Sequence, residues 1–333
     1  MTQQTKPKRP TQRNIAEAVG VSIAAVSRAL ADDPLIAQST RDLVKQKAQE
    51  LGYVPDRAAQ RLRTGRTNVL SLVLPPHEEL LGFGTSLERG ITQALANTDF
   101  HLVVMPDFGD ATALTSIKRI VENGQADGLF LSRTEPNDLR VRYLLENDFP
   151  FVSHGRTELA TPHSYVDYDN RAFAYQAVER LSKQRATNLA ILLPPAHLMF
   201  HFHVAQGFQA ACKDFDCYGQ VLEGADLDSD PNQIARAVKD HFDAHPKTNG
   251  LVLPGDTSAL AAMSALQDMG LIPSKDIHLV VKQTSGVFQF VRPKVSNVYE
   301  DISAAGFSMA NHLLKLIDGE SPTNLQTLVR QEG

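Results

Sequence analysis

One stretch decides how the N-terminal part of this chain folds: residues 15–30 read IAEAVGVSIAAVSRAL. Gly20 supplies the positive φ that ends a helix, and Ser22 is a favourable N-cap for the next one. On each side of this turn, apolar residues recur at helical spacing and mark the inner faces. These residues are Ile15, Ala16, Val19, Val26 and Leu30, with Val21 as an apolar plug in the turn. The pattern predicts two short helices joined by a tight turn.

The second of these helices has a distinctive outer side. Its outward and N-terminal positions are occupied by Ile23, Ala24, Ala25, Ser27 and Arg28. In a helix-turn-helix domain, the second helix presents such positions to base edges in the major groove. A third helix is predicted to follow, with Ser39 as its cap, Asp42 completing a capping-box pair and Gly52 ending it. Its buried stripe comprises Val44, Ala48 and Leu51.

Charge is distributed unevenly along the 333 residues. Positions 1–66 carry 12 Lys and Arg against 6 Asp and Glu, whereas the rest of the chain carries 21 against 32. A small basic head on an acidic body fits nucleic-acid binding, because phosphate contacts supply much of the affinity. The alternative is a solvated charged tail. Residues 1–10, which are polar and basic with two prolines, are expected to be disordered.

The segment after the third helix is unusually basic. Residues 53–68 read YVPDRAAQRLRTGRTN, with Asp56 placed to cap a short helix over 57–63. A helix of this length is marginal alone in water, so it would form on docking to DNA and to its own symmetry mate. Leu62 is then a candidate wedge for a base step in the minor groove. The alternative is a basic linker whose leucine packs on the body. The arginines of the segment are Arg57, Arg61, Arg63 and Arg66.

From Asn68 onward, buried-strand patterns alternate with amphipathic helices. Strands are predicted at 69–75, 101–106, 127–132, 149–154, 188–194, 250–255 and 277–281, with helices that include 85–96, 171–184, 205–213, 233–243 and 257–269. The strand runs are apolar on both faces, as in parallel strands covered by helices on two sides. The number of strands favours two sheets in two lobes that divide near 155–165. The predicted fold is an all-α helix-turn-helix head plus an α/β body of two doubly wound parallel-sheet lobes.

Several function classes are disfavoured by what the sequence lacks. No apolar run is long enough to span a bilayer and the N-terminus does not read as a secretory signal, so a cytoplasmic protein without membrane contact is expected. Cys212 and Cys217 make neither a disulfide framework nor a metal pattern. The chain shows no phosphate-binding loop, nucleophile elbow or dinucleotide fingerprint, so an enzyme is disfavoured and no cofactor is expected. A binding protein for transport would suit the body but not the head.

Residues 11–68 resemble the head and hinge of the lactose repressor (LacI/GalR) family. The resemblance runs without a gap through Ala16-Glu17, Gly20-Val21-Ser22, Val26-Ser27-Arg28, Thr40-Arg41, Leu51-Gly52-Tyr53-Pro55 and Ala59-Leu62. It implies a bacterial repressor that acts as a homodimer, or alternatively a tetramer, on near-palindromic operator DNA. It also implies a body like periplasmic sugar-binding proteins. A mono- or oligosaccharide is therefore the expected effector, with a purine-type corepressor as the alternative.

The resemblance also assigns roles to residues of the head. Contacts to phosphates or bases at helix ends are matched by Thr11, Ser22, Ser27 and Thr40. Ile23 and Ala24 stand at the two positions that select the operator, where apolar side chains offer van der Waals contact, for instance to thymine methyl groups. Arg28 matches the position that reads guanine. The minor-groove segment supplies Arg57, Ala59 and Leu62.

In such a body, a ligand lies between the lobes, beyond the carboxyl ends of the strands. The candidate effector-binding residues at these ends are Phe83, His154, Arg156, Tyr168, Asp169, His201, Phe202, His203, Asp256 and Gln283. Three positions depart from the family's pattern. Val204 replaces an arginine, Gly155 replaces an acidic residue after the fourth strand, and a second acidic residue is replaced by Lys282 or Gln283. The sequence HGR at 154–156 resembles regulators that respond to α-glucosides.

Other interpretations of these residues stay open at the level of sequence. His197, His201 and His203 invite a metal site, but no acidic or cysteine partner sits beside them, so loop histidines without a metal are predicted. For four candidates the alternative is a structural role: a strand-end salt bridge for Arg156, a helix N-cap for Asp256, and core packing for Tyr168 and Phe83. The predicted boundaries are 1–10 for the tail, 11–55 for the head, 56–66 for the hinge and 67–333 for the effector-binding and dimerisation domain.

Overall fold

The structure is a computed structural model that describes residues 10–54, 65–74, 82–106 and 112–330. The chain divides into two compact units, residues 1–67 and 68–333. The hinge helix predicted over 57–63, with Arg57, Ala59 and Leu62, lies outside the described residues, as do residues 1–9 of the predicted tail. In the part of the chain that the structure describes, no helix is long and apolar enough to cross a membrane.

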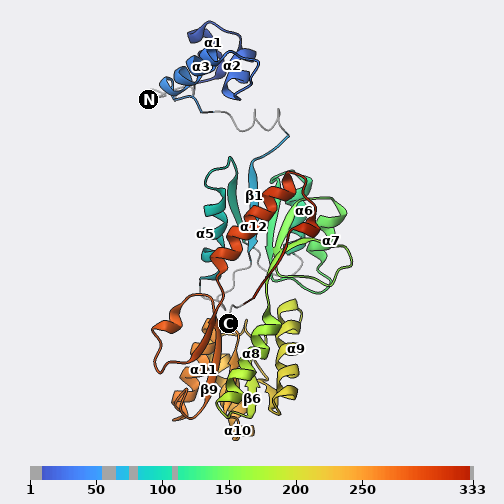
Figure 1. The fold of residues 1–333 in the computed structure, drawn as a ribbon, viewed down its shortest axis with the longest axis vertical. Coiled ribbons are helices and arrows are strands. Elements are labelled where there is room, and N and C mark those ends of the chain that lie inside the picture. Colours follow the sequence, from blue (N-terminus) through green and yellow to red (C-terminus); the bar gives the residue numbers. More distant parts are fainter. Residues whose placement is uncertain (1–9, 55–64, 75–81, 107–111, 331–333) are drawn as a thin grey trace, which may run out of the picture. The chain divides into compact units, whose positions relative to one another are not determined.

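The described part of the first unit contains the three helices that the sequence predicts. They are α1 (Gln12–Val19), α2 (Ile23–Leu30) and α3 (Gln38–Glu50) (Figure 1). Gly20 has a φ of 75° at the end of α1, and Ser22 caps α2 by accepting a hydrogen bond from the Ala25 N–H at 3.1 Å. The predicted turn is therefore confirmed. The helices share one buried core, formed by Ile15, Ala16, Val26, Ala29, Val44 and Ala48.

The start of α3 differs from the prediction. Ser39 does not cap the helix, because the helix begins earlier and its N-cap is Ala37, whose side chain accepts no hydrogen bond. The Arg41 guanidinium fastens this end instead. It donates at 3.0 Å to the carbonyl oxygens of Asp33 and Ile36. The connection between α2 and α3 is therefore held by a contact over eight positions, which a local capping pattern does not reveal.

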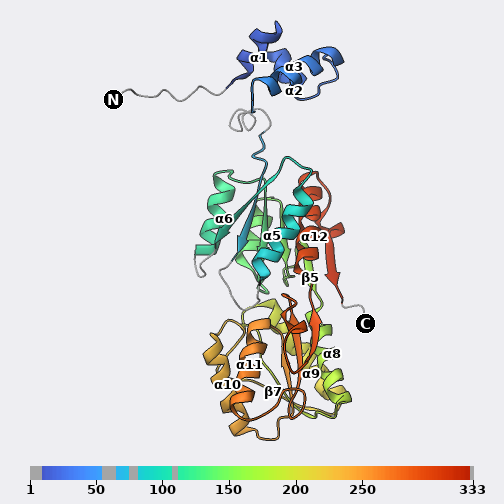
Figure 2. The same ribbon diagram turned by 90° about the vertical axis from the view of Figure 1, so that its left-hand side faces the viewer.

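The first lobe of the second unit holds a six-stranded parallel sheet in the order β11-β5-β4-β3-β1-β2. Its strands are β1 (Val69–Leu74), β2 (His101–Pro106), β3 (Gly128–Ser132), β4 (Phe151–His154), β5 (Ser164–Tyr168) and β11 (Gln326–Val329). One face is covered by α5 (Phe83–Leu95) and α12 (Ile302–Ile317), which lie side by side in Figure 2. The other face is covered by α6 (Thr112–Glu122) and α7 (Leu139–Glu146).

The second lobe holds a five-stranded parallel sheet in the order β10-β9-β8-β6-β7. Its strands are β6 (Asn188–Ile191), β7 (Tyr218–Val221), β8 (Gly250–Leu253), β9 (His278–Gln283) and β10 (Ser296–Tyr299). One face packs on α8 (Asn170–Lys183) and α9 (Met199–Asp214), and the other on α10 (Pro231–Ala244) and α11 (Asp256–Asp268). Both lobes are thus doubly wound parallel sheets, and the predicted fold class is confirmed.

Two details of the body differ from the prediction. The lobes do not divide at 155–165, because β5 still belongs to the first sheet, and the chain enters the second lobe only after Tyr168. It later returns, since α12 and β11 complete the first lobe. The strand β2 is also not buried on both faces. It is an edge strand whose Val103 and Val104 are 44% and 39% exposed.

Two glycines allow α5 and α12 to pack closely. A Cβ atom on Gly90 would overlap the carbonyl oxygen of Ser303, and a Cβ atom on Gly306 would overlap that of Leu87. Backbone thus meets backbone at the centre of this helix pair, where side chains cannot adjust to make room. The pair carries much of the core of the first lobe, since Leu87, Ile91 and Met309 are fully buried in it.

We expect Gly90→Ala to lower the free energy of unfolding by about 1–3 kcal/mol, because the added methyl group forces the two helices apart. Urea unfolding followed by circular dichroism measures the change. Gln93→Ala lies on the exposed side of α5 and serves as the matched control, with an expected change below ~0.5 kcal/mol. A Gly90→Ala protein as stable as the parent would contradict the close approach of the helices.

Candidate functional site

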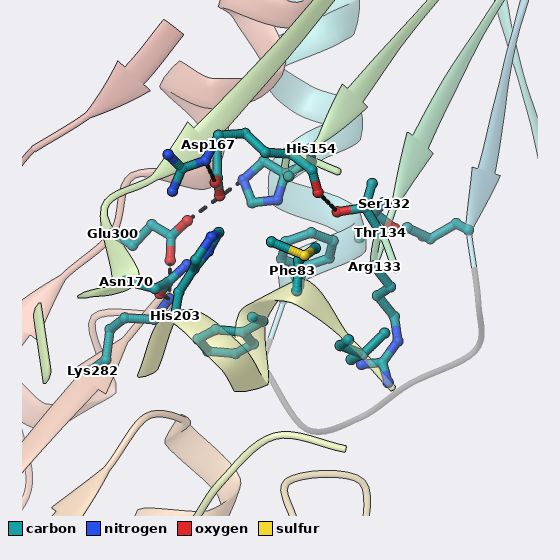
Figure 3. A pocket seen from close by; sticks show the side chains of 17 residues that line it. Phe83, Ser132, Arg133, Thr134, His154, Asp167, Asn170, His203, Lys282 and Glu300 are labelled. Carbon is teal, nitrogen blue, oxygen red and sulfur yellow. Dashed lines mark hydrogen bonds and ion pairs between the residues drawn. The ribbon is translucent and has the colours of Figure 1, made fainter. Parts of the chain in front are cut away.

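The carboxyl ends of strands from both lobes surround a cavity of about 230 Å³, which we call the interlobe pocket. Its apolar wall consists of Leu74, Phe83, Leu198, Met199 and Phe200. Its polar wall includes Ser132, Arg133, Thr134, His154, Arg156, Asp167, Asn170, His203, Lys282 and Glu300. Figure 3 shows the labelled side chains of both lobes converging on one space.

A buried ion pair forms part of the polar wall. Lys282 and Glu300 are 2% and 5% exposed, and Lys282 Nζ donates to the Glu300 carboxylate at 2.6 Å. The ammonium group also donates to Asn170 Oδ1 at 2.7 Å and lies 4.4 Å from the centre of the Phe200 ring. Burial by itself raises the pKa of Glu300, but the neighbouring ammonium and imidazole groups outweigh it and lower the pKa to about 2. The carboxylate is therefore ionised at neutral pH.

Two further ion pairs border the pocket. Arg156 Nε donates to Asp167 Oδ2 at 2.7 Å. Arg133, at the end of β3, pairs with Asp228 of the second lobe at 2.5 Å and so connects the two lobes. Each charged side chain that lines the pocket thus has a partner of opposite sign. Because the charges are balanced, the pocket offers hydrogen bonds without a net attraction for an ion, which suits a neutral polar ligand.

The pocket also holds polar groups that are free to bind a ligand. Ser132 is 1% exposed, and its hydroxyl has no hydrogen-bond partner among the described residues. A buried hydroxyl without a partner is costly, so a ligand that bonds it gains affinity. Burial lowers the pKa of His203 below its usual value, which keeps the imidazole neutral at neutral pH and able to donate and accept.

Four of the residues predicted to bind the effector line the pocket: Phe83, His154, Arg156 and His203. The rings of Phe83 and His154 meet edge to face with their centres 5.4 Å apart. Two others, Tyr168 and Asp169, do not line the pocket. Tyr168 is buried with its ring centre 5.0 Å from Lys282 Nζ, as the alternative of core packing predicts, and Asp169 caps α8 through a hydrogen bond from the Ala172 N–H at 3.0 Å.

Asp256 and Gln283 do not line the pocket. Asp256 is fully buried, and its carboxylate accepts hydrogen bonds from the Thr284 N–H at 2.9 Å and the Ser285 hydroxyl at 2.7 Å. It therefore joins α11 to the loop after β9. Gln283 donates to Asn297 Oδ1 at 2.6 Å, which ties β9 to β10. Asp256 follows β8 and Gln283 ends β9, but these contacts hold both side chains within the second lobe.

His201 and Phe202 also lie outside the lining, and the reason is the start of α9. The helix begins at Met199 rather than at 205, so His201 and His203 lie in a helix and not in a loop as predicted, whereas His197 precedes the helix in a turn. Helical geometry sends neighbouring side chains in different directions. His201 Nδ1 accordingly pairs with the Pro194 carbonyl at 2.7 Å, and Phe202 is 39% exposed, while His203 faces the pocket. Among the described residues, no cluster of three or more His, Cys, Asp or Glu is placed to hold a metal ion.

The prediction missed several residues of the polar wall, and Glu300 and Lys282 are the most important. Glu300 follows β10, a four-residue strand that the sequence pattern did not reveal. Had that strand been predicted, the rule that ligands bind beyond strand ends would have indicated Glu300. Lys282 was noted only as a departure from the family's pattern. The structure shows that Lys282 and Glu300 form one buried ion pair.

In the first unit, the predicted DNA-binding residues within 10–54 lie on or directly before the three helices, and each is exposed or half-buried. Thr11 precedes α1 and donates to Asn14 Oδ1 at 2.8 Å. The exposed residues at the start of α2 are Ser22, Ile23 and Ala24, and Ala25 and Ser27 are half-buried behind them. Thr40 lies in the first turn of α3 and Arg28 lies exposed in the last turn of α2. Helix N-termini present free N–H groups and a partial positive charge, which suits contacts to phosphates.

Comparisons with known proteins agree with both units. Residues 11–56 match the model of bacterial regulatory proteins of the lacI family, and residues 67–330 match that of periplasmic binding proteins and the sugar binding domain of the LacI family. The chain is 29% identical to the transcriptional regulator AglR of Rhizobium meliloti over 96% of this chain and 91% of that protein. It is 28% identical to the regulator CelR of Thermobifida fusca over 98% and 99% of the two chains.

A solved structure agrees with the fold. The lac repressor dimer bound to operator and the anti-inducer ONPF is similar with a TM-score of 0.82 over 97% of both chains, at 18% identity.

A helix-turn-helix head on a two-lobed α/β body with a pocket between the lobes defines a ligand-responsive transcription regulator. The chain belongs to the LacI family of bacterial regulators, which are DNA-binding proteins with an effector-binding domain and not enzymes.

Proposed function

We propose that this protein is a repressor that binds a near-palindromic operator as a homodimer. Its affinity for the operator falls or rises when a neutral sugar binds in the interlobe pocket. The observation that carries the effector class is the balanced charge of the polar wall opposite an apolar wall with two aromatic rings, Phe83 and Phe200. Sugars present hydroxyl groups at their edges and C–H groups on their faces, which fits such a pair of walls. The solved complex of CelR with cellobiose shows the same fold at 24% identity, with a TM-score of 0.71 over 97% of this chain and 98% of that one.

A purine-type corepressor is the second candidate, because a purine is also neutral, planar and polar at its edge. A thermal-shift screen with glucose, maltose, sucrose and cellobiose on one side and adenine, guanine and hypoxanthine on the other separates the two. A ligand that binds only the folded state raises the melting temperature. Shifts with the purines alone would overturn the proposal of a sugar effector.

DNA binding and assembly are tested directly. Footprinting on the promoter beside the protein's own gene should show protection of a near-palindromic site that changes when the effector is added. Absence of protection at low salt, with and without ligand, would overturn the proposed function.

Analytical ultracentrifugation should give twice the chain mass of 36.5 kDa for a dimer, with four times that mass indicating a tetramer. The exposed valines on the edge strand β2 support association of the first lobes.

Phe200 is expected to be the aromatic anchor of the sugar. Phe200→Ala should weaken the affinity for the sugar selected in the screen by about 10-fold or more, because a stacking face and its contact with Lys282 are lost. Isothermal titration calorimetry measures the change. Phe202→Ala is the matched control on the same helix, since Phe202 is outside the pocket lining, and it should leave the affinity within about twofold. If Phe202→Ala weakened the sugar affinity more than Phe200→Ala did, the effector-binding role predicted for Phe202 from the sequence would be supported instead.

A further inference from the structure

The turn that follows α2, the helix predicted to enter the major groove, is fixed by several hydrogen bonds at once. The Asp33 N–H donates to the carbonyl oxygen of Arg28 at 3.1 Å, and Asp32 between them has a φ of 56°, as in a Schellman ending. The Asp33 carbonyl oxygen accepts from Arg41 Nη1 at 3.0 Å, and its Oδ1 accepts from the Leu35 N–H at 2.9 Å. Three groups of Asp33 are thus held by other parts of the head, so its second carboxylate oxygen occupies a defined position.

That second oxygen holds the side chain that matches the guanine-reading position. Asp33 Oδ2 accepts a hydrogen bond from Arg28 Nε at 2.7 Å. The contact uses Nε–H and leaves the two terminal amino groups, which show no hydrogen bond to another described residue. These groups, Nη1 and Nη2, are the pair with which an arginine can meet guanine O6 and N7 end on. The hydrogen bonds from Arg28 and Leu35 also lower the pKa of Asp33, so its carboxylate is ionised at neutral pH.

We infer that Asp33 is a positioning residue for operator specificity, which holds the Arg28 guanidinium so that its terminal edge is presented to guanine. This inference rests on the proposed readout of guanine by Arg28. A long side chain that is already oriented loses less conformational freedom on binding, so affinity for the correct base rises. The carboxylate also offsets the charge of Arg28, and attraction to phosphates of any sequence weakens. Both effects increase the ratio of specific to non-specific binding.

The chain contains a matched control one residue away. Asp32 lies in the same turn and pairs with Lys45 Nζ at 2.5 Å rather than with Arg28. Asp32→Asn and Asp33→Asn remove the same charge from the same turn, and asparagine tolerates the left-handed conformation of position 32. At position 33 the amide has only one oxygen. The amino group that takes the place of the second oxygen cannot accept from Arg28 Nε while the remaining oxygen accepts from the Leu35 N–H, so the arginine is released.

The experiment uses the full chain and a pool of random DNA from which bound sequences are selected and sequenced. The parent protein should enrich one near-palindromic sequence. Arg28→Ala should flatten the base preference at one position of each half-site, and Asp33→Asn should flatten the same position, lowering the affinity ratio of guanine to other bases at least about fivefold. Affinity for random DNA should stay equal or rise, and Asp32→Asn should keep the parent's preference.

A double-mutant cycle separates positioning from a general effect on the fold. Asp33→Asn should change nothing further in an Arg28→Ala background, because the residue acts through that side chain. An equal loss in both backgrounds, or an unchanged preference in Asp33→Asn, would overturn the inference while the proposed function stands. A parent protein that enriches no sequence would overturn the proposed function and this inference with it.

Discussion

Replacing Glu300 by alanine is expected to lower the free energy of unfolding of the body by about 3–5 kcal/mol, because the change leaves a buried ammonium group without its counter-charge. Lys282 is 2% exposed, and its remaining polar contact is Asn170 Oδ1 at 2.7 Å. The aromatic rings of Tyr168 and Phe200 around it are weaker partners than a carboxylate. Urea unfolding of the parent and the variant measures the loss.

The double variant Lys282→Met with Glu300→Leu serves as the control. Since it removes both charges and keeps the volume, it should recover most of the lost stability. Both proteins should bind the sugar effector poorly, because each loses polar groups of the pocket wall. Strong coupling between Lys282 and Glu300 would be contradicted by either of two results. One is a Glu300→Ala variant as stable as the parent, and the other is a double variant no more stable than Glu300→Ala.

The pH dependence of stability tests the same pair with the native sequence. The pKa of Glu300 is lowered from its usual 4.5 to about 2 in the folded protein, so the carboxylate stabilises the fold fully above pH 4.5. As the pH falls from about 4.5 towards 2, the unfolded state takes up a proton before the folded state does, and this stabilisation is lost. The difference in urea midpoint between the parent and Glu300→Gln should therefore shrink across this range.

Most of the strands that were predicted correctly are apolar runs whose burial is visible in the sequence, although the predicted edge strand β2 is largely exposed. The central strands β1, β3 and β8 are covered on both faces and read as apolar runs. Three of the missed strands, β7, β10 and β11, lie at sheet edges, where one side is open and polar residues are tolerated. The fourth missed strand, β5, is internal. Its sequence SYVDY contains two tyrosines and an aspartate, so it does not read as an apolar run.

The site was predicted only where local sequence decides the position. His154 ends a strand that was predicted, Arg156 follows it, and both line the pocket. Lys282 and Glu300 meet although they are 18 positions apart, because two neighbouring parallel strands carry them to the same edge. Register between strands is set by the packed sheet rather than by either segment alone. A pair of this kind therefore becomes visible only with the fold.

Gly155 is the position where the departure from the family's pattern has a physical cause. Its φ is 114°, a conformation that side chains rarely adopt, and a Cβ atom there would lie 2.6 Å from Thr134 Oγ1. That hydroxyl donates to the Arg156 carbonyl at 2.6 Å, and the Ser153 hydroxyl donates to the Gly155 carbonyl at 2.6 Å. The acidic residue expected here from the resemblance has no room, and the carboxylates of the wall are supplied instead by Asp167 and, from the other lobe, by Glu300.

We therefore expect Gly155→Ala to lower the free energy of unfolding by about 3 kcal/mol, with contributions from backbone strain and from the overlap with Thr134. Displacement of Thr134 releases the Arg156 carbonyl, so affinity for the sugar should fall about 10-fold or more.

Gly224→Ala is the matched control. Its φ is 81° but no atom lies within 4 Å of the added Cβ, so it carries the strain without the overlap. It should cost about 1 kcal/mol and leave sugar affinity unchanged. If both variants lose the same stability and keep the same affinity, the loop around Gly155 does not shape the pocket, and the acidic residue is absent for a reason other than space.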